Sequence, residues 1–332
     1  MAKKDEEVKV GLSALEATMA RINKAMGEGT VYEYKNYTGA PKERISTGSI
    51  SVDYITGGGW LRGAMNYISG FESSGKSTLC LYAIASCQAE GLKCAYIDHE
   101  YCFDKAYAES LGVNVDELIV TQPDCIEDGY QILIDLVKTG EIGCVVFDSI
   151  AAAQTKKELE GDVGDQTMGV KAKLNSVTYP KITQVLKEFN VVGMFVNQLR
   201  EKIGISYGSP ITEPGGNAVK FYPSIKVEVR QSTKDKDSDG VITGNLIKAK
   251  CTKNKTARPF LETEYTIEYG LGIDKTKEIL DFAVWMNIIN RSGSWFSYGD
   301  TKLGQGANKV VDLLNDNPEL LEEIEGLVRA NF

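Results

Sequence analysis

Short apolar runs alternate with amphipathic helical patterns between about residues 45 and 270. A short apolar run bounded by turn signals is typical of a buried strand, whereas apolar positions at steps of three and four indicate a helix. Strands that alternate with helices favour an α/β fold built on a largely parallel sheet. Four runs are predicted to be buried strands of that sheet, namely residues 93–98, 117–121, 144–148 and 191–198.

The rhythm changes near residue 225. Residues 225–229 alternate apolar and polar side chains, and residues 246–250 follow a turn-rich break, so an antiparallel pair at the sheet edge is predicted. The break at residues 235–240 resembles the start of an EF-hand calcium loop. Its twelfth position is Leu246 rather than glutamate and its flanks read as strands, so a solvated hairpin turn is favoured over calcium binding.

The N-terminal region carries a separate helical pattern. Alternating steps of three and four predict one apolar stripe on a helix that Gly27 and Gly29 end; its members are Leu12, Leu15, Met19, Ile22 and Met26. So short a helix cannot bury its stripe alone, so the stripe is expected to pack either on the core of the same chain or on a neighbouring subunit. The sequence leaves both alternatives open.

The chain turns helical again after about residue 275. Pro318 directly after Asn317 predicts a helix start, because proline suits the first helical turn. Three parts are therefore expected: an N-terminal helix segment at residues 1–37, a large core at 38–272 and a small C-terminal domain at 273–332.

Composition adds exclusions to this outline. The 332 residues are 42% hydrophobic and 25% charged, which is ordinary for a globular protein with one large core. No apolar run approaches the ~18 residues that span a membrane, and no signal-type segment follows the charged start, so a cytoplasmic protein is expected. Seven cysteines without a C-x-x-C pair indicate reduced thiols and no zinc site. A net charge of −9 means that any nucleic-acid binding needs local basic groups.

Residues 70–77 match the phosphate-loop pattern G-x-x-x-x-G-K-[ST] in full. Residues 64–68 lead in as a strand and residues 78–85 lead out as a helix, which is the frame this loop needs. Glycines let backbone N–H groups turn toward phosphate oxygens, and the helix N-terminus adds positive potential. A nucleoside triphosphate site is favoured over a plain Gly-Ser turn, with Lys76 on the β and γ phosphates and Ser77 on Mg²⁺.

Three predicted strands end in polar residues at the sheet edge where ligands of parallel α/β proteins bind. Glu100 is the favoured acid to orient or deprotonate the attacking water, whereas Asp98 is expected to be buried and structural. Asp148 closes an apolar run in the Walker B pattern and would hold Mg²⁺. Gln198 either senses the γ-phosphate or caps its strand end. His99 is the only histidine, and a catalytic role is not expected because hydrolysis needs a carboxylate.

Together with the phosphate loop, six further segments resemble the RecA-type recombinases, closest to the bacterial and phage members, from about residue 10 to 330. These segments are residues 45–53, 160–169, 197–204, 215–222, 253–255 and 304–306. The chain departs from the family pattern at Asp162, Asp165, Pro180, residues 101–103 and residues 211–214, and it stops at Phe332 without the acidic tail common in bacterial members.

The resemblance implies a RecA-like P-loop ATPase core with a mainly parallel sheet, an N-terminal helix for oligomerisation and a small α+β C-terminal domain. It implies a helical filament on single-stranded DNA, assembled with ATP and Mg²⁺. That filament would pair with homologous duplex DNA and exchange strands, with DNA-stimulated ATP hydrolysis.

Site residues carry over from the family motif by motif. Glu100, Lys76 and Gln198 are the implied catalytic residues, and Ser77 and Asp148 the metal ligands. The implied nucleotide contacts are Gly70, Glu72, Ser73, Ser74, Gly75, Lys76, Ser77, Thr78, Asp104 and Tyr107. Asp104 and Tyr107 would hold the adenine, Tyr107 by stacking on it, and Lys253 and Lys255 would reach ATP on the next subunit. The implied DNA-binding loops span about residues 160–169 and 199–217, with contacts from Met168, Lys173, Ser176, Arg200, Lys202, Ile203, Gly215, Gly216 and Asn217.

Several alternatives stay open. Met168 and Ile203 are apolar residues in polar loops, which suits wedges between stacked bases or a local packing contact. An ATP-assembled filament or mediator with little exchange activity is a second interpretation, and a measurement of DNA-stimulated phosphate release would separate it from a recombinase. A P-loop kinase or transferase would need an arginine-rich lid, whereas the basic residues here lie in glycine-bordered loops.

Overall fold

The computed structural model describes residues 13–33, 35, 42–162, 169–201, 211–236 and 240–332. Contacts divide the chain into two units, residues 1–42 and 43–332. In the first, helix α1 (Ala14–Met26) begins with a capping box, in which Ser13 and Glu16 each bond the other's backbone N–H, and ends at Gly27. None of its residues is buried, so the predicted docking of its stripe stays a prediction.

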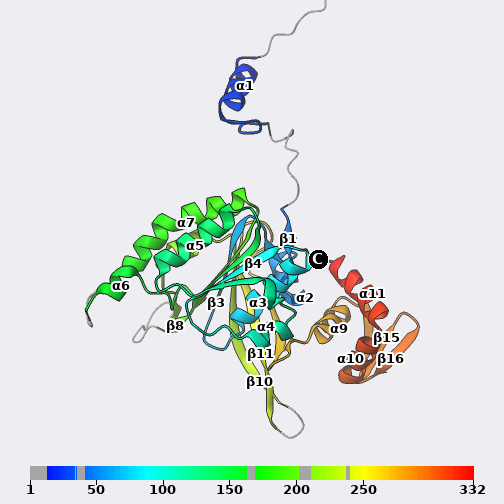
Figure 1. The fold of residues 1–332 in the computed structure, drawn as a ribbon. Coiled ribbons are helices and arrows are strands. Elements are labelled where there is room, and N and C mark those ends of the chain that lie inside the picture. Colours follow the sequence, from blue (N-terminus) through cyan, green and yellow to red (C-terminus); the bar gives the residue numbers. More distant parts are fainter. Residues whose placement is uncertain (1–12, 34, 36–41, 163–168, 202–210, 237–239) are drawn as a thin grey trace, which may run out of the picture. The chain divides into compact units, whose positions relative to one another are not determined.

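The second unit is built around one large sheet (Figure 1). Its described strands number nine, in the order β13-β12-β11-β10-β3-β7-β6-β4-β5. The strands from β10 to β5 pair in parallel, while β10, β11, β12 and β13 pair antiparallel. Their bounds are β3 (Ala64–Gly70), β4 (Lys93–Asp98), β5 (Leu118–Thr121), β6 (Ile142–Asp148), β7 (Val192–Gln198), β10 (Ile225–Lys236), β11 (Ile242–Asn254), β12 (Glu262–Glu268) and β13 (Gly272–Ile273).

Alternate side chains of the central strands enter two different cores. In β6, Cys144 and Val146 join the core under α3, whereas Val145 and Phe147 join the core under α5 and α7. This split follows from the two-residue period of a strand, and it explains why these runs are apolar throughout. Figure 1 shows α5 and α7 together on one face, with α3 and α4 on the other. The covering helices are α2 (Ile50–Thr56), α3 (Lys76–Ala89), α4 (Lys105–Ser110), α5 (Ile126–Lys138) and α7 (Val170–Glu188).

Two details of the predicted sheet are wrong. The strand at residues 117–121 is not buried: β5 forms the end of the sheet, and Ile119 and Val120 are 38% and 41% exposed. The predicted antiparallel pair is confirmed as β10 and β11, but it is not at the edge, because β12 and β13 extend the sheet beyond it. A local sequence pattern can indicate whether two strands pair in parallel or antiparallel. The position of a strand in the sheet depends instead on where the other strands of the chain add to it.

Short elements connect these larger ones. The β10–β11 connection that resembles an EF-hand is flanked by strands, as expected of a hairpin, and residues 237–239 within it lie outside the described residues. The short elements are β1 (Arg44–Ile45), β2 (Trp60–Leu61), the 3₁₀ turn η2 (Val115–Glu117), α6 (Lys156–Glu160), β8 (Arg200–Glu201), β9 (Ile211–Thr212) and α8 (Ala218–Phe221).

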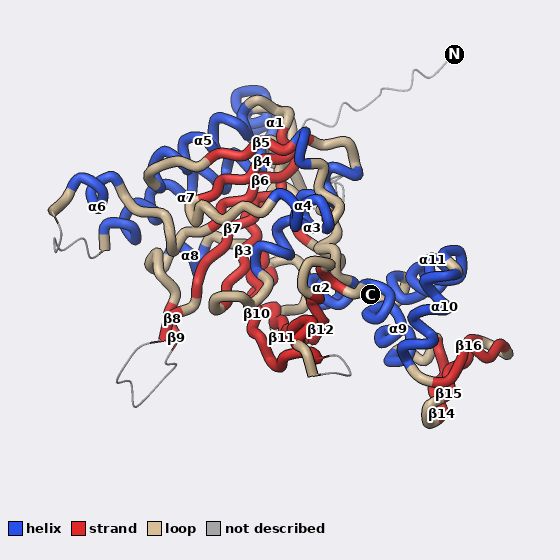
Figure 2. The backbone as a smooth tube through the Cα atoms, turned by 60° about the horizontal axis from the view of Figure 1, so that its bottom comes forward, coloured by secondary structure: helices blue, strands red, loops and turns tan. Residues whose placement is uncertain are grey.

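The C-terminal region forms its own core. Figure 2 shows its helices beside a small sheet, to one side of the large one. A proline at the first turn starts α11, as predicted. The elements are α9 (Lys275–Trp285), β14 (Ile289–Ser292), β15 (Trp295–Tyr298), β16 (Thr301–Gln305), α10 (Ala307–Asp316) and α11 (Pro318–Arg329), with the three strands antiparallel. This is the small α+β domain that the sequence predicts.

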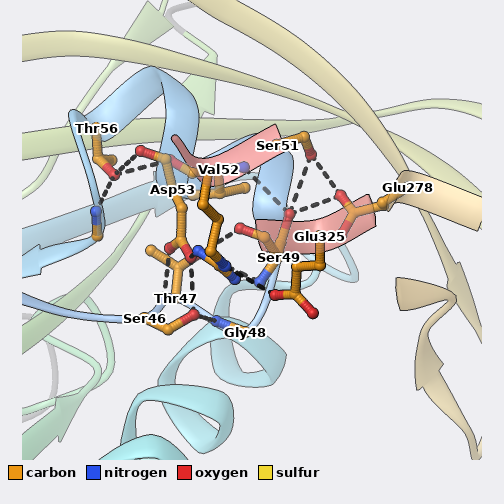
Figure 3. Close-up of polar contacts among 12 residues, drawn as sticks. Ser46, Thr47, Gly48, Ser49, Ser51, Val52, Asp53, Thr56, Glu278 and Glu325 are labelled. Atoms are coloured by element: carbon orange, nitrogen blue, oxygen red, sulfur yellow. Dashed lines mark hydrogen bonds and ion pairs between the residues drawn. The ribbon is translucent and has the colours of Figure 1, made fainter. Parts of the chain in front are cut away.

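Helix α2 joins this domain to the large core (Figure 3). The hydroxyls of Ser49 and Ser51 both donate to Glu278 Oε1 on α9. Arg329 Nη1 on α11 lies 3.0 Å from Oδ2 of the fully buried Asp53. Burial raises the pKa of Glu278 to about 7, although the two serine hydroxyls oppose the shift.

Within the described ranges, no helix has both the length and the apolar character needed to cross a membrane. All seven cysteines are free thiols, of which Cys102 alone is exposed.

Candidate nucleotide and DNA sites

The phosphate loop curls between β3 and α3 around a cavity of about 210 Å³. Gly75 is the residue before α3 and has a φ of 82°, a left-handed conformation that favours glycine. Loop residues 72–78 line the cavity together with Glu100, Asp148 and Gln198, which follow or end three other strands. The parallel strands bring these residues together, because their carboxyl ends meet at one edge of the sheet.

Lys76 lies inside this loop. Its Nζ donates to the Phe71 carbonyl at 2.6 Å, so the ammonium group is held where the loop curls. Burial lowers the pKa of Lys76, while the carboxylates of Asp148 and Glu100 oppose that shift. A cation thus occupies the centre of the phosphate loop, at the N-terminus of a helix.

Asp148 and Ser77 lie side by side at the bottom of the site. Ser77 Oγ and Tyr96 OH both donate to Asp148 Oδ2, each at 2.7 Å. Burial raises the pKa of Asp148 to about 6, and the two hydroxyl donors oppose the rise. A hydroxyl and a carboxylate are oxygen ligands of the kind that Mg²⁺ uses together with water and substrate phosphates. The pair therefore fits the metal role predicted for it.

Glu100 is held by two neighbours, one at the end of β7 and one directly after β6. Gln198 Nε2 donates to Glu100 Oε1 at 3.0 Å, and Ser149 Oγ donates to the same oxygen. Asp98 instead accepts from the backbone N–H groups of residues 100 and 103 and from Gln122, and it is fully buried. The structure thus places Glu100 in the cavity and Asp98 in a structural network.

His99 lies between these carboxylates along the chain and points into the interior. Burial lowers the pKa of His99 to about 4, so the ring is neutral near pH 7. Its ring centroid is 4.8 Å from that of Phe147, and it does not line the cavity. This placement agrees with a packing role.

Tyr107, predicted to stack on adenine, lies beside the phosphate loop. Its hydroxyl is 2.9 Å from Thr78 Oγ1. Asp104 caps α4 and accepts from the Tyr107 backbone N–H at 3.0 Å, so α4 carries both predicted adenine contacts on its first turn.

Lys253 and Lys255 lie away from this cavity, at the end of β11 and just after it. Lys253 Nζ donates to the carbonyl oxygens of Lys220 and Phe221, at 2.8 Å each. Burial, with help from Lys255 and Lys226, lowers the pKa of Lys253 to about 8. Neither lysine lines the cavity of its own chain. This is compatible with the predicted contact to ATP on a neighbouring subunit.

The described ends of the two predicted DNA loops meet at α7. Asn175 Nδ2 donates to the Gly215 carbonyl at 2.9 Å, and a Cβ added to Gly216 would lie 2.5 Å from Ala172 Cβ. Only glycine permits this approach, because Gly216 also has a φ of 79°. Lys173, Ser176, Arg200 and Asn217 are exposed in this region. Met168, Lys202 and Ile203 lie outside the described residues.

Two residues of the nucleotide site escaped the sequence analysis. Ser149 directly follows Asp148 and bonds Glu100, and Tyr96 bonds Asp148 from the middle of β4. Ser149 had a signal, since it shares the strand end with Asp148. Tyr96 had none, because an aromatic residue in an apolar strand reads as core.

Family membership follows from comparison with known proteins. The family model described as the RecA N-terminal domain matches residues 13–274, and that of the RecA C-terminal domain matches residues 277–332. The chain belongs to the RecA family. The predicted membership of the RecA-type recombinases and the predicted RecA-like fold are thereby confirmed.

Relatives within the RecA family match nearly the whole chain. Protein RecA of Rhodospirillum rubrum is 45% identical over 320 residues, which is 96% of this chain and 87% of that protein. Protein RecA of Bacteroides thetaiotaomicron is 45% identical over 318 residues, 96% of each chain. The crystal structure of the RadB recombinase shares the fold, with a TM-score of 0.53 and 22% identity over 69% of this chain and 98% of that one. The chain is therefore a RecA recombinase, an ATP-binding, DNA-dependent ATPase with strand-exchange function.

Proposed function

We propose that this RecA-family chain hydrolyses ATP with Mg²⁺ at the phosphate loop and does so as a filament on single-stranded DNA in the cytoplasm. The observation that carries the proposal is the convergence of Lys76, Glu100, Asp148 and Gln198 on one cavity. A cation, a carboxylate, a metal ligand and an amide donor are the groups that phosphoryl transfer to water requires.

Each residue has a separate task in this proposal. Lys76 and the backbone N–H groups of the loop neutralise the phosphates of ATP. Ser77 and Asp148 hold Mg²⁺, which supplies positive charge for the developing negative charge on the phosphate oxygens. Glu100 orients the attacking water and accepts its proton at a carboxylate oxygen. Tyr107 and Asp104 hold the adenine ring.

Gln198 provides the link to DNA. Its amide donates to Glu100 here, and the same donor would reach a γ-phosphate oxygen in the same cavity. The second DNA loop begins directly after it, so movement of Gln198 changes where that loop starts. The DNA contacts proposed are Met168, Lys173, Ser176, Arg200, Lys202, Ile203, Gly215, Gly216 and Asn217. Cations among them neutralise phosphates, and sequence is read by base pairing between strands.

Lys253 and Lys255 complete the proposal at the level of the filament. They contact ATP held by the next subunit, so that bound nucleotide holds neighbouring copies together. Homologous duplex DNA is the second partner, which the filament pairs with the strand it holds.

The experiment that tests this function is a D-loop assay with ATP and with a slowly hydrolysed analogue. We expect joint molecules with both nucleotides, and DNA-stimulated phosphate release with ATP only. Lys76→Ala should abolish hydrolysis, because the γ-phosphate loses its main cation; near-normal turnover in that variant would refute the site. Nucleotide-dependent filaments that never yield joint molecules would favour the mediator alternative.

A further inference from the structure

A largely buried ion pair lies at the exit of the second DNA loop. Lys226 Nζ is 2.5 Å from Glu213 Oε1 and 2.6 Å from Oε2, and the two side chains are only 14% and 8% exposed. By contrast, both members of the Lys93–Glu141 pair are more than 60% exposed. Exposed ion pairs contribute little to folding stability. A buried pair is costly to desolvate, and removing one of its partners is strongly destabilising because the other charge stays buried without a partner.

The pair joins the loop to the large sheet. Glu213 directly follows β9, which pairs with β8 at the base of the loop. Lys226 lies on β10, where it is the register partner of Lys253 on β11. One contact therefore connects the end of the DNA loop with the strand pair that carries the lysine directed at the neighbouring nucleotide.

The same pair is connected to the nucleotide cavity through Tyr67 and Asn197. Lys226 Nζ lies 5.2 Å from the centroid of the Tyr67 ring. Asn197 Nδ2 donates to Tyr67 OH at 2.6 Å and to the Pro214 carbonyl at 2.8 Å. Asn197 also accepts from the backbone N–H of Gln198, which bonds Glu100 in the cavity.

Apart from the Glu213–Lys226 ion pair, the side chains of this network are polar and uncharged. Burial raises the pKa of Tyr67 well above its ordinary value, and the Glu213 carboxylate adds to the rise, so the ring stays neutral. A phenol, an amide and one ion pair, each satisfied by the next, form a network with a specific geometry.

We propose that Glu213 and Lys226 are positioning residues whose ion pair holds the loop exit, Gln198 and the Lys253 strand in one arrangement, so that DNA on the loop sets the rate of ATP hydrolysis. This inference rests on the function proposed above. The contacts make these residues contiguous, and the variants below measure how strongly they couple the loop to ATP hydrolysis.

The test compares the wild type with Glu213→Gln, Lys226→Met and the double variant. Each single change leaves one buried charge unpaired, so both should lower the melting temperature. The double variant removes both charges together, so its melting temperature should return close to that of the wild type. Its ratio of ATPase rates with and without oligo(dT) should nevertheless fall about 10-fold, since the loop exit is no longer held to β10.

Two further variants separate positioning from folding. Lys226→Arg keeps the charge and should retain most of the stimulation. Tyr67→Phe disturbs neither charge but removes the oxygen that accepts from Asn197, and it should lower the stimulation about 3-fold without unfolding the chain. A Lys93→Met, Glu141→Gln double variant, which neutralises an exposed pair at the amino end of β4, is the matched control and should behave as wild type.

The outcomes are distinct. A stable double variant with the wild-type stimulation ratio would overturn the inference, because the pair would then be structural only. If the double variant does not fold, an unchanged ratio in Tyr67→Phe overturns it instead. A wild-type chain that hydrolyses ATP without any response to DNA would overturn the proposed function itself.

Discussion

Two charged side chains in the nucleotide cavity have pKa values shifted from their ordinary values. Burial raises the pKa of Asp148 to about 6 and lowers the pKa of Lys76, because each charged form loses water. Perturbed groups of opposite sign that share a cavity are characteristic of functional sites. A bound phosphate would stabilise the charged form of Lys76, and a bound Mg²⁺ would stabilise the charged form of Asp148.

Glu100→Gln tests the proposed base. Glutamine keeps the shape and can still meet Gln198 and Ser149, but it cannot accept a proton from water. We expect nucleotide binding to persist while turnover falls at least ~100-fold, leaving long-lived filaments on DNA. Phosphate release and filament lifetime measure the effect, with the exposed Glu109→Gln as control. Rapid filament decay in Glu100→Gln would contradict the role.

Tyr96→Phe tests the environment of Asp148. The Tyr96 hydroxyl lowers the pKa of Asp148, so its loss should raise that pKa further above about 6. Only the ionised carboxylate holds Mg²⁺ well, so wild-type affinity should weaken as pH falls through about 6. The variant should show the same loss at higher pH and need about 5-fold more Mg²⁺ at pH 7. The Mg²⁺ dependence of ATPase rates at pH 6, 7 and 8 measures this, and identical curves for the two proteins would exclude it.

At the level of elements, the short helix α2 holds the C-terminal domain. Ser49 and Ser51 contact α9, and Asp53 contacts α11. Tyr54 adds edge-on ring contacts to Phe282, Trp285 and Phe332, at centroid distances of 5.4 to 5.6 Å. This seven-residue helix and its N-cap residue Ser49 therefore carry polar, ionic and aromatic contacts to the C-terminal domain.

Glu278→Gln makes this junction testable by pH. The folded chain keeps the Glu278 proton up to about pH 7, whereas the unfolded chain loses it near the ordinary value of 4.5. Stability from this group is therefore lost as pH rises from about 4.5 to 7, by about 3 kcal/mol in total, and stays level above. The variant cannot titrate, so its stability relative to wild type should increase across that window.

Urea unfolding at pH 5 and pH 8 measures the difference between the two proteins. Glu319→Gln, an exposed change on the first turn of α11, is the control. Wild type and Glu278→Gln curves that shift equally between the two pH values would show that Glu278 does not titrate as its burial predicts.

On the scale of the whole molecule, the nucleotide site of one chain lacks Lys253 and Lys255, which lie at the end of β11 and just after it, outside the cavity. If each copy supplies these lysines to its neighbour, ATP becomes part of the interface between copies. Assembly and hydrolysis are then properties of the filament rather than of one chain.

Lys253→Ala tests that arrangement. ATP-dependent assembly should be lost, while nucleotide affinity of the single chain should change little, because the lysine does not line its own cavity. Burial lowers the pKa of Lys253 to about 8, so assembly of the wild type should also weaken as pH rises through that value. Light scattering with and without ATP measures assembly, with exposed Lys93→Ala as control. Unchanged assembly in Lys253→Ala would remove the case for ATP as a link between copies.

Much of the site could be read from local pattern. The phosphate loop and the acids at strand ends were found because each depends on a few consecutive residues in a strand–loop–helix frame. Tyr96 and the Glu213–Lys226 pair could not be found this way. Their partners lie 52 and 13 positions away, and side chains so separated meet only when the chain folds.

The sequence by itself determined the alternation of strands and helices, the phosphate loop and the family, because these depend on short-range periodicity and on motifs of adjacent residues. The tertiary structure alone decided which strand became the exposed end of the sheet, which carboxylates lost water, and which charges were paired in the interior. Those properties depend on neighbours from distant parts of the chain, and they appear only when packing excludes solvent around them.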